Sequence, residues 1–326
     1  LNSCEYLDYR PVIQAGYYLF HKKKLYESGL WDEDLLWFFG EEALESKTKT
    51  VERNNISAEN GGYYTIRRKE GWAMMRCHSF KDRPAHADML HLDLWWKGIN
   101  FLRDSGSYLY NTSEKWLEYF MGTAAHNTVR IDQVSQMEKE RLWNWYYWTK
   151  SRFIGATDNT AENIHTIAGE HYGYKRLGHN ITHKRTVYSI HDYWVIVDDI
   201  SGKGTHRAEL YWQLNDCDIT QVENCFALNK SGNAVYMSLL CDKPIHSMDL
   251  MKGDTDIPAG FESLYYGQMQ SAPVLKINVN DVLPITIITL LSCGKKINNS
   301  KWDIPCLLYT SPSPRDLSTS RMPSSA

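Results

Sequence analysis

From Gly61 onward, apolar residues recur at every second position in many short runs, and this alternation constrains the fold more than any other feature. A period of two is typical of half-buried β-strands, whereas helices repeat apolar residues every three to four positions. Turn-forming residues such as Lys97-Gly98 and His191-Asp192 separate most of the runs. The pattern predicts a mainly β fold, a large antiparallel β-sandwich. The predicted strands are 63–67, 72–78, 88–96, 99–108, 127–131, 182–190, 193–200, 208–214, 234–240 and 282–291.

The beginning and end of the chain differ from this pattern. Apolar residues at helical spacing predict a helix over 9–21, and a second short helix runs from its cap at Asp32 to Gly40. The last residues are rich in Ser, Thr and Pro, which cannot build a core, so this tail is expected to be non-native and disordered. The predicted organisation is helices in 1–50, a linker in 51–60, the β-sandwich domain in 61–306 and the tail in 307–326.

Composition excludes several partners and favours another. The net charge is −3 and no long run of basic residues stands out beyond Lys22 to Lys24, so neither nucleic acid nor an anionic membrane surface is an expected partner. No apolar run approaches the roughly 20 residues of a membrane span. The 12 Trp and 21 Tyr residues suit carbohydrate surfaces as well as cores. The aromatic run 141–150 could stack on sugar rings, although its alternation favours packing in the core.

The segment 83–111 reads as a β-hairpin that carries unusual polar residues. Between 88 and 96, the even positions are apolar and share one face, while His91 and Asp93 lie on the other. A two-residue turn at Lys97-Gly98 would place His91 across from Asp104. One interpretation is therefore a cross-strand His/Asp pair on the surface, without chemistry.

A second interpretation adds residues outside that strand. His86 lies at the open end of the hairpin, Asp104 precedes Ser105-Gly106, and His126 begins the next predicted strand. Two imidazoles and one carboxylate at one end of a sheet would suit Zn²⁺ with an open fourth position. Spacing leaves this interpretation and a purely hydrogen-bonded cluster both open.

Several separated motifs resemble one protein family in the order in which they occur. They are R-P-A-H-A-D-M-L-H-L-D-L-W-W-K-G-I-N at 83–100, R-D-S-G-S-Y-L-Y-N at 103–111, A-A-H-N-T-V-R-I-D at 124–132 and the stretch 173–200. Together they resemble the sheet domain of the heparinase II/III-like polysaccharide lyases. The helical start resembles the end of the (α/α) toroid of that family. Because the chain begins at Leu1, most of the toroid and any export signal are expected to be missing.

The resemblance implies a zinc ion held by His, Asp and His, which fall on His86, Asp104 and His126 of this sequence. Such an ion is expected to be structural and to brace the edge of a cleft. The family also carries a catalytic His two residues before the first metal ligand, and Pro84 stands there in this chain. Proline has no titratable group, so that chemistry cannot come from this position.

The resemblance implies a polysaccharide lyase that cleaves a uronic-acid-containing polysaccharide, a glycosaminoglycan or exopolysaccharide, by β-elimination. Tyr110 is a candidate proton donor and Arg83 a candidate substrate contact, although packing or an ion pair would explain each as well. The remaining catalytic groups of the family lie in the toroid, so this chain alone is expected to be nearly inactive. The alternative is a non-catalytic carbohydrate-binding or exopolysaccharide-assembly protein, which Pro84 favours. Export to the periplasm, cell envelope or exterior of a bacterium is implied by the resemblance alone.

Overall fold

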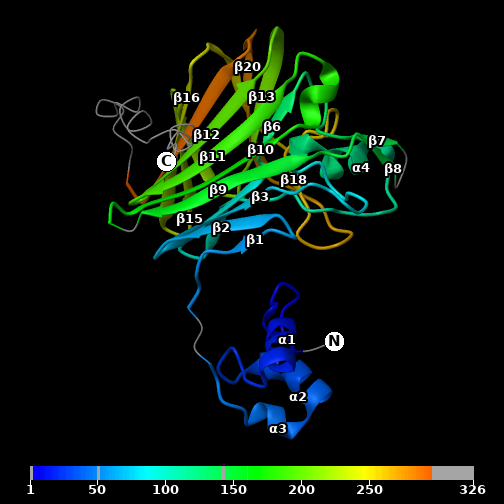
Figure 1. Ribbon diagram of the computed structural model, residues 1–326, viewed down its shortest axis with the longest axis vertical. Coiled ribbons are helices and arrows are strands. Elements are labelled where there is room, and N and C mark those ends of the chain that lie inside the picture. The colour runs from blue at the N-terminus through cyan, green and yellow to red at the C-terminus, as the bar shows by residue number, and fades with distance from the viewer. Residues whose placement is uncertain (1–2, 50–51, 141–143, 160, 296–326) are drawn as a thin grey trace, which may run out of the picture. The chain divides into compact units, whose positions relative to one another are not determined.

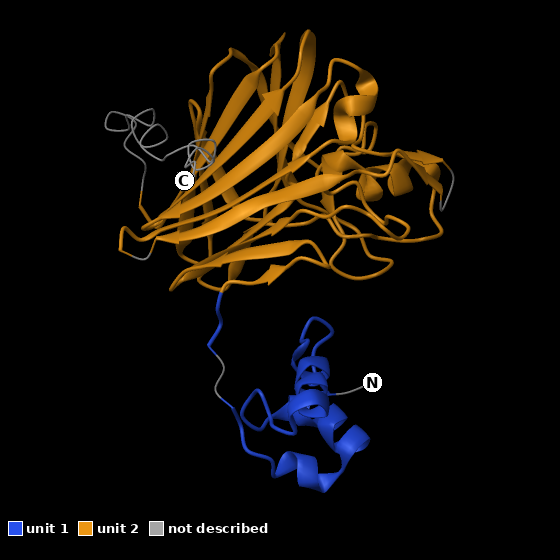
Figure 2. Ribbon diagram, in the orientation of Figure 1, with its two compact units in different colours: residues 1–54 blue, residues 55–326 orange. Residues whose placement is uncertain are grey.

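The computed structural model describes residues 3–49, 52–140, 144–159 and 161–295. The chain divides into two compact units, Leu1–Asn54 and Asn55–Ala326 (Figure 2). The division falls inside the predicted linker 51–60. The predicted tail, residues 307–326, lies outside the described residues.

The first unit is helical. It contains α1 (Arg10–His21), the 3₁₀ turn η1 (Leu30–Asp32), α2 (Glu33–Phe39) and α3 (Glu41–Leu44). The predicted helices 9–21 and 32–40 are thus confirmed. Gln14 joins them, because its side chain accepts the backbone N–H of Leu25 at 2.8 Å and donates to Asp32 at 2.8 Å.

The second unit is built from antiparallel sheets that enclose a common apolar core (Figure 1). The largest sheet has eight strands, in the order β14 (Asp218–Val222), β15 (Cys225–Lys230), β16 (Asn233–Cys241), β21 (Ile285–Cys293), β12 (Tyr193–Ser201), β11 (Thr182–Ile190), β10 (Ile164–His171) and β9 (Ser151–Asn159). A four-stranded sheet has the order β17 (Ile245–Lys252), β20 (Pro273–Val282), β13 (Thr205–Gln213) and β6 (Val129–Ile131).

A five-stranded sheet and two short hairpins complete this unit. The five strands are β1 (Ser57–Ala58), β2 (Tyr63–Arg67), β3 (Gly71–Arg76), β4 (Leu92–Trp96) and β5 (Ile99–Leu102). The hairpins pair β7 (Glu138–Glu140) with β8 (Asn144–Tyr146), and β18 (Phe261–Glu262) with β19 (Gln270–Ser271). Three helical segments lie between strands, namely α4 (Glu114–Met121), η2 (Thr123–Ala125) and η3 (Gly173–Leu177). The predicted mainly β, antiparallel fold is confirmed.

Two local predictions were wrong. The turn at Lys97-Gly98 does pair Trp96 with Ile99, but the register then shifts at a bulge between Leu94 and Trp95. His91 lies just before the first residue of β4, and Asp104 lies beyond the last residue of β5. These two residues are therefore not cross-strand partners. In the aromatic run, Trp145 is buried but Tyr146, Tyr147 and Trp148 are exposed, so the expected core packing holds for Trp145 alone; residues 141–143 lie outside the described residues.

A membrane span was not expected. Among the residues that the structure describes, no helix combines the length and the apolar character needed to cross a bilayer.

Candidate metal centre

Three segments that are far apart in the sequence bring His86, Asp104 and His126 together, and we call these residues the His86 cluster. His86 lies in the loop before β4, Asp104 follows β5, and His126 follows η2. Nδ1 of His86 lies 3.3 Å from Nε2 of His126, and Nδ1 of His126 lies 2.7 Å from Oδ2 of Asp104. His126 is buried, whereas the side chain of Asp104 is 37% exposed, so the cluster opens to solvent at the carboxylate.

Backbone contacts fix the two loops that carry the cluster. Beside His86, the backbone N–H of Ala87 donates to the carbonyl of Met121 at 2.8 Å. The carbonyl of Ala87 accepts a hydrogen bond from the hydroxyl of Thr123 at 3.0 Å. Beside Asp104, Gly106 donates its N–H to Oδ1 of Asp104 at 2.7 Å. Gly106 has a φ of +81°, and a Cβ there would collide with the backbone carbonyl of Ser263. The Asp-Ser-Gly turn therefore requires its glycine.

His91 lies next to the cluster and offers a second way to group its ligands. One ligand atom each of His91, Asp104 and His126 can be chosen so that all lie within 4.8 Å of one another. However, Nδ1 of His91 accepts the backbone N–H of Asn127 at 3.0 Å, so its lone pair is already used. His91 therefore fits a supporting role better than that of a ligand, and the geometry favours His86.

Asn127 organises this region, and sequence reasoning did not identify it. Besides its bond to His91, it donates its side-chain amide to the carbonyls of Leu92 and Arg103 at 2.8 and 3.2 Å. It is fully buried. The sequence did offer a signal for this residue. An Asn stands between His126 and the apolar residues of β6, and a polar side chain at a buried position of this kind usually has hydrogen-bond partners.

Charge is distributed unequally among the three side chains. Partial removal from water raises the pKa of the Asp104 carboxyl, but the adjacent His126, His91 and His86 outweigh this effect and hold that pKa below its usual range. Burial lowers the pKa of His126, yet the charge and hydrogen bond of Asp104 raise it overall. Burial and the neighbouring His126 lower the pKa of His86. The lowered pKa favours the neutral form of His86, the form in which an imidazole can bind a cation.

The residues fit a zinc ion. A tetrahedral ion with metal–nitrogen bonds of about 2.0–2.1 Å separates two nitrogen ligands by about 3.3 Å. This is the separation of Nδ1 of His86 and Nε2 of His126. Asp104 on the other nitrogen of His126 matches the carboxylate–histidine–metal arrangement that orients a ligand. Zinc at this cluster stays a prediction, but Asp104 differs from its predicted role as a third ligand, because it bonds the nitrogen of His126 that faces away from His86 and so is placed to orient that histidine.

The remaining predicted site residues lie as follows. Tyr110 is 52% exposed, and its ring lies 5.5 Å from that of Tyr266. Arg83 is exposed, while Pro84 beside it is buried. Ser107, which sequence reasoning also missed, places its hydroxyl 3.2 Å from Nε2 of His86.

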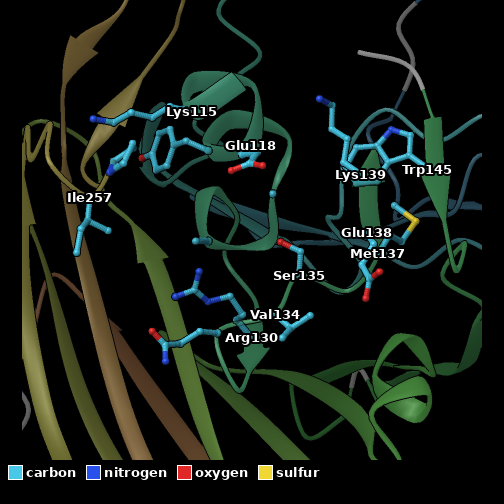
Figure 3. A pocket seen from close by; sticks show the side chains of 15 residues that line it. Lys115, Glu118, Arg130, Val134, Ser135, Met137, Glu138, Lys139, Trp145 and Ile257 are labelled. Atoms are coloured by element: carbon cyan, nitrogen blue, oxygen red, sulfur yellow. The ribbon is translucent and has the colours of Figure 1, made fainter. Parts of the chain in front are cut away.

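A cavity of about 640 Å³ lies near α4 and the β7–β8 hairpin (Figure 3). Its charged lining is mixed, with basic and acidic side chains. Figure 3 shows Lys115 and Glu118 on α4, Arg130 below them and Lys139 beside Trp145 on the hairpin. Arg130 is engaged by Glu209 at 2.6 Å.

Comparison with known proteins places the chain in a family. The family model described as heparinase II/III-like, C-terminal, matches residues 50–259. A heparin-sulfate lyase of Bacteroides stercoris is 25% identical over 204 residues, which are 60% of this chain and 28% of that protein.

Solved structures share the fold. The heparinase III BT4657 gene product has a TM-score of 0.69 at 19% identity, covering 91% of this chain and 42% of that one. The heparan sulfate lyase HepC of Pedobacter heparinus has a TM-score of 0.65 at 18% identity, covering 89% and 42%. The chain spans less than half the length of each of these relatives. Because the family model matches more than half of its 326 residues, the chain belongs to the heparinase II/III-like family, whose C-terminal sheet domain it contains.

Proposed function

We propose that the protein contributes the sheet domain of a polysaccharide lyase that cleaves a uronic-acid-containing polysaccharide by β-elimination. The observation that carries this proposal is the meeting of His86, Asp104 and His126 in a chain of this family. A heparin-sulfate lyase and a heparan sulfate lyase among the relatives support an acidic glycosaminoglycan as the substrate class.

The His86 cluster would hold a structural Zn²⁺ ion. When bound, the ion would supply a fixed positive charge that crosslinks the loops carrying His86 and His126. Two further residues would support the ligands of the ion. Asp104 orients His126 through Nδ1, and the hydroxyl of Ser107 contacts His86.

An eliminative lyase must neutralise the uronate carboxylate, remove the C5 proton and protonate the leaving oxygen. Lys115 and Lys139 at the cavity are placed to contact sulfate or carboxylate groups of a chain, and Arg83 is a further exposed cation. Tyr110 is the proposed proton donor within this chain. Pro84 cannot act as the base, so we propose that the other proton-transfer groups come from an (α/α) toroid and that residues 1–326 alone are nearly inactive.

A non-catalytic carbohydrate-binding protein is the second candidate, and Pro84 is the observation that favours it. Such a protein would retain an acidic polysaccharide partner without forming product. Either function agrees with export to a bacterial periplasm or cell surface, which we propose on the resemblance.

The test incubates the full-length protein and residues 1–326 with heparan sulfate, hyaluronan and alginate. Product is followed by the ultraviolet absorbance of the unsaturated uronate, and bound metal by mass spectrometry without chelator. We expect product from the full-length protein only. In the full-length protein, His86→Ala should remove the bound zinc and lower the rate of product formation by about 10–100-fold. His246 is an exposed histidine on β17, so His246→Ala should keep the wild-type zinc content and rate.

Two results would overturn these proposals. Binding of polysaccharide by the full-length protein without any unsaturated product would replace the lyase with the binder. Equal zinc contents in wild type and His86→Ala would remove the metal assignment while leaving the lyase proposal to the product assay.

A further inference from the structure

A second group of histidines meets at the turn between β12 and β13. Nδ1 of His179 lies 3.1 Å from Nε2 of His206, and the two nitrogens lie 2.9 and 3.1 Å from the carbonyl oxygen of Lys203. On its other side, His206 contacts Oδ2 of Asp132 through Nδ1 at 2.7 Å. We call His179, His206, Asp132 and the Lys203–Gly204 backbone the Gly204 turn site.

The backbone holds this site in place from three directions. Lys203 donates its N–H to the carbonyl of His179 at 3.1 Å, and the carbonyl of Gly204 accepts the N–H of Leu283 at 2.9 Å. Asp132 donates its backbone N–H to the carbonyl of Arg207 at 2.8 Å. In return, the backbone N–H of Arg207 donates to Oδ1 of Asp132 at 2.9 Å. The arrangement is therefore fixed by main-chain contacts.

When both histidines are neutral, the available hydrogen atoms do not satisfy the three central atoms. A carboxylate only accepts, so Nδ1 of His206 carries the proton that faces Asp132. In neutral His206, Nε2 then directs a lone pair towards the carbonyl of Lys203. Nδ1 of His179 has one proton, which can form a good hydrogen bond either with the carbonyl oxygen of Lys203 or with Nε2 of His206, but not with both. The three atoms thus surround an electron-rich point that a cation would satisfy.

Gly204 keeps the approach to both nitrogens open. A Cβ at this position would lie 2.6 Å from Nδ1 of His179 and 3.4 Å from Nε2 of His206. His179 is exposed, so the site is reachable from solvent. Any side chain at residue 204 would fill the space beside the two potential ligands.

We propose that His179, His206 and the carbonyl of Lys203 bind a first-row transition metal ion such as Zn²⁺, with Asp132 orienting His206. Two imidazole nitrogens and one oxygen suit Zn²⁺, with water in the fourth position. Bonds of about 2.0–2.1 Å to nitrogen require the imidazole nitrogens to be about 3.3 Å apart, so the side chains need to separate only slightly from 3.1 Å. Asp132 acts as the carboxylate that fixes the tautomer and orientation of a ligating histidine. This site shares no residue with the His86 cluster.

The test measures zinc bound per chain after equilibrium dialysis at neutral pH against a fixed free Zn²⁺ concentration. We expect His179→Gln and His206→Gln each to bind one equivalent less than wild type. His246→Gln, an exposed histidine elsewhere, should bind as much as wild type. The difference of one equivalent is expected whether or not the His86 cluster also holds zinc.

Two glycine variants provide a matched steric test. Gly204→Ala should lose the same equivalent, because the new Cβ occupies the approach. Gly232→Ala has a similar positive φ, +75° against +83°, but its Cβ would meet nothing within 4 Å, so it controls for backbone strain. Circular dichroism establishes that each variant is folded. Unchanged zinc binding in folded His179→Gln and His206→Gln would overturn the proposal and leave a site satisfied by protons alone.

Discussion

His171, His183 and Asp198 form a directed chain of hydrogen bonds in the interior of the second unit. Nδ1 of His171 accepts the N–H of Gly173 at 3.3 Å, so the proton of His171 is on Nε2. That proton faces Nδ1 of His183 at 3.2 Å, and Nε2 of His183 donates to Asp198 at 2.7 Å. Every step has one donor and one acceptor. Both histidines are therefore satisfied in the neutral form, although neither is exposed to water.

A consequence of this chain is a loss of stability at acidic pH. Burial, followed by His183 and Arg185, holds the pKa of His171 well below its ordinary value. Below about pH 6.5 the unfolded chain binds a proton at this histidine that the folded chain does not, so the free energy of unfolding decreases as pH falls. We expect a contribution of about 1.4 kcal/mol per pH unit from His171, measured by urea unfolding between about pH 6.5 and 5.

Substitutions separate this histidine from the others. In His171→Gln, the amide can still accept from Gly173 and donate to His183, but it does not titrate. Its unfolding free energy should therefore fall less steeply with decreasing pH than that of wild type, while His246→Gln should keep the wild-type slope. Equal slopes in His171→Gln and wild type would rule out His171 as a source of the acid sensitivity.

At the level of residues, sequence motifs marked candidate positions, whereas contacts between distant segments could be found only in the three-dimensional structure. His86 and His126 were identified as candidates from separated motifs, and their 3.3 Å approach depends on loops that no spacing reveals. His91 was assigned to a cross-strand pair with Asp104, but the bulge at Leu94 shifted the register; the two side chains still approach to 3.7 Å. Asn127 was missed because its importance lies in contacts with distant segments.

At the level of elements, alternation predicted some strands with their bounds and missed others, among them β10 and β15. β2 and β11 have the predicted bounds of 63–67 and 182–190. β9 was missed because its exposed end gives little apolar contrast. The strand predicted over 282–291 crosses the turn at Leu283-Pro284, which separates β20 from β21.

Arg185 joins several of these elements. From β11 it holds Asp198 on β12 with two bonds of 2.7 and 3.0 Å. It also donates to the carbonyls of Leu90 and Asn127, which lie beside the loops of the His86 cluster. All of these contacts are buried. We expect Arg185→Ala to lower the free energy of unfolding by about 3–5 kcal/mol, because it leaves Asp198 buried without its principal counter-charge.

Urea unfolding of Arg185→Ala measures this effect, and Arg152→Ala is the matched control. Arg152 pairs with Glu170 at 2.9 Å on the neighbouring strands β9 and β10, but its side chain is 66% exposed. Exposed pairs contribute little, so the control should unfold close to wild type. Similar losses in both variants would show that removal of an arginine side chain matters here more than burial of the carboxylate.

At the level of the whole molecule, the two units differ in how much apolar surface they bury. The core of the second unit draws on all three of its large sheets, with residues such as Leu92, Ile196 and Ile277 fully buried. In the described part of the first unit, the buried apolar side chains are few and small apart from Leu35, while Phe20, Trp37 and Phe38 are 73–80% exposed. A unit of this size with so small a core is marginal on its own.

We therefore expect the two units to behave differently when separated. A chain that begins at Asn55 should unfold in one cooperative transition at a midpoint close to that of residues 1–326, because its core is complete without the helices. Residues 1–54 alone should give a largely unfolded circular dichroism spectrum, because exposed aromatic rings contribute no burial to offset the loss of chain entropy. A cooperative thermal transition of residues 1–54 alone, or the loss of one in the chain beginning at Asn55, would show that stability is not distributed between the units as their cores imply.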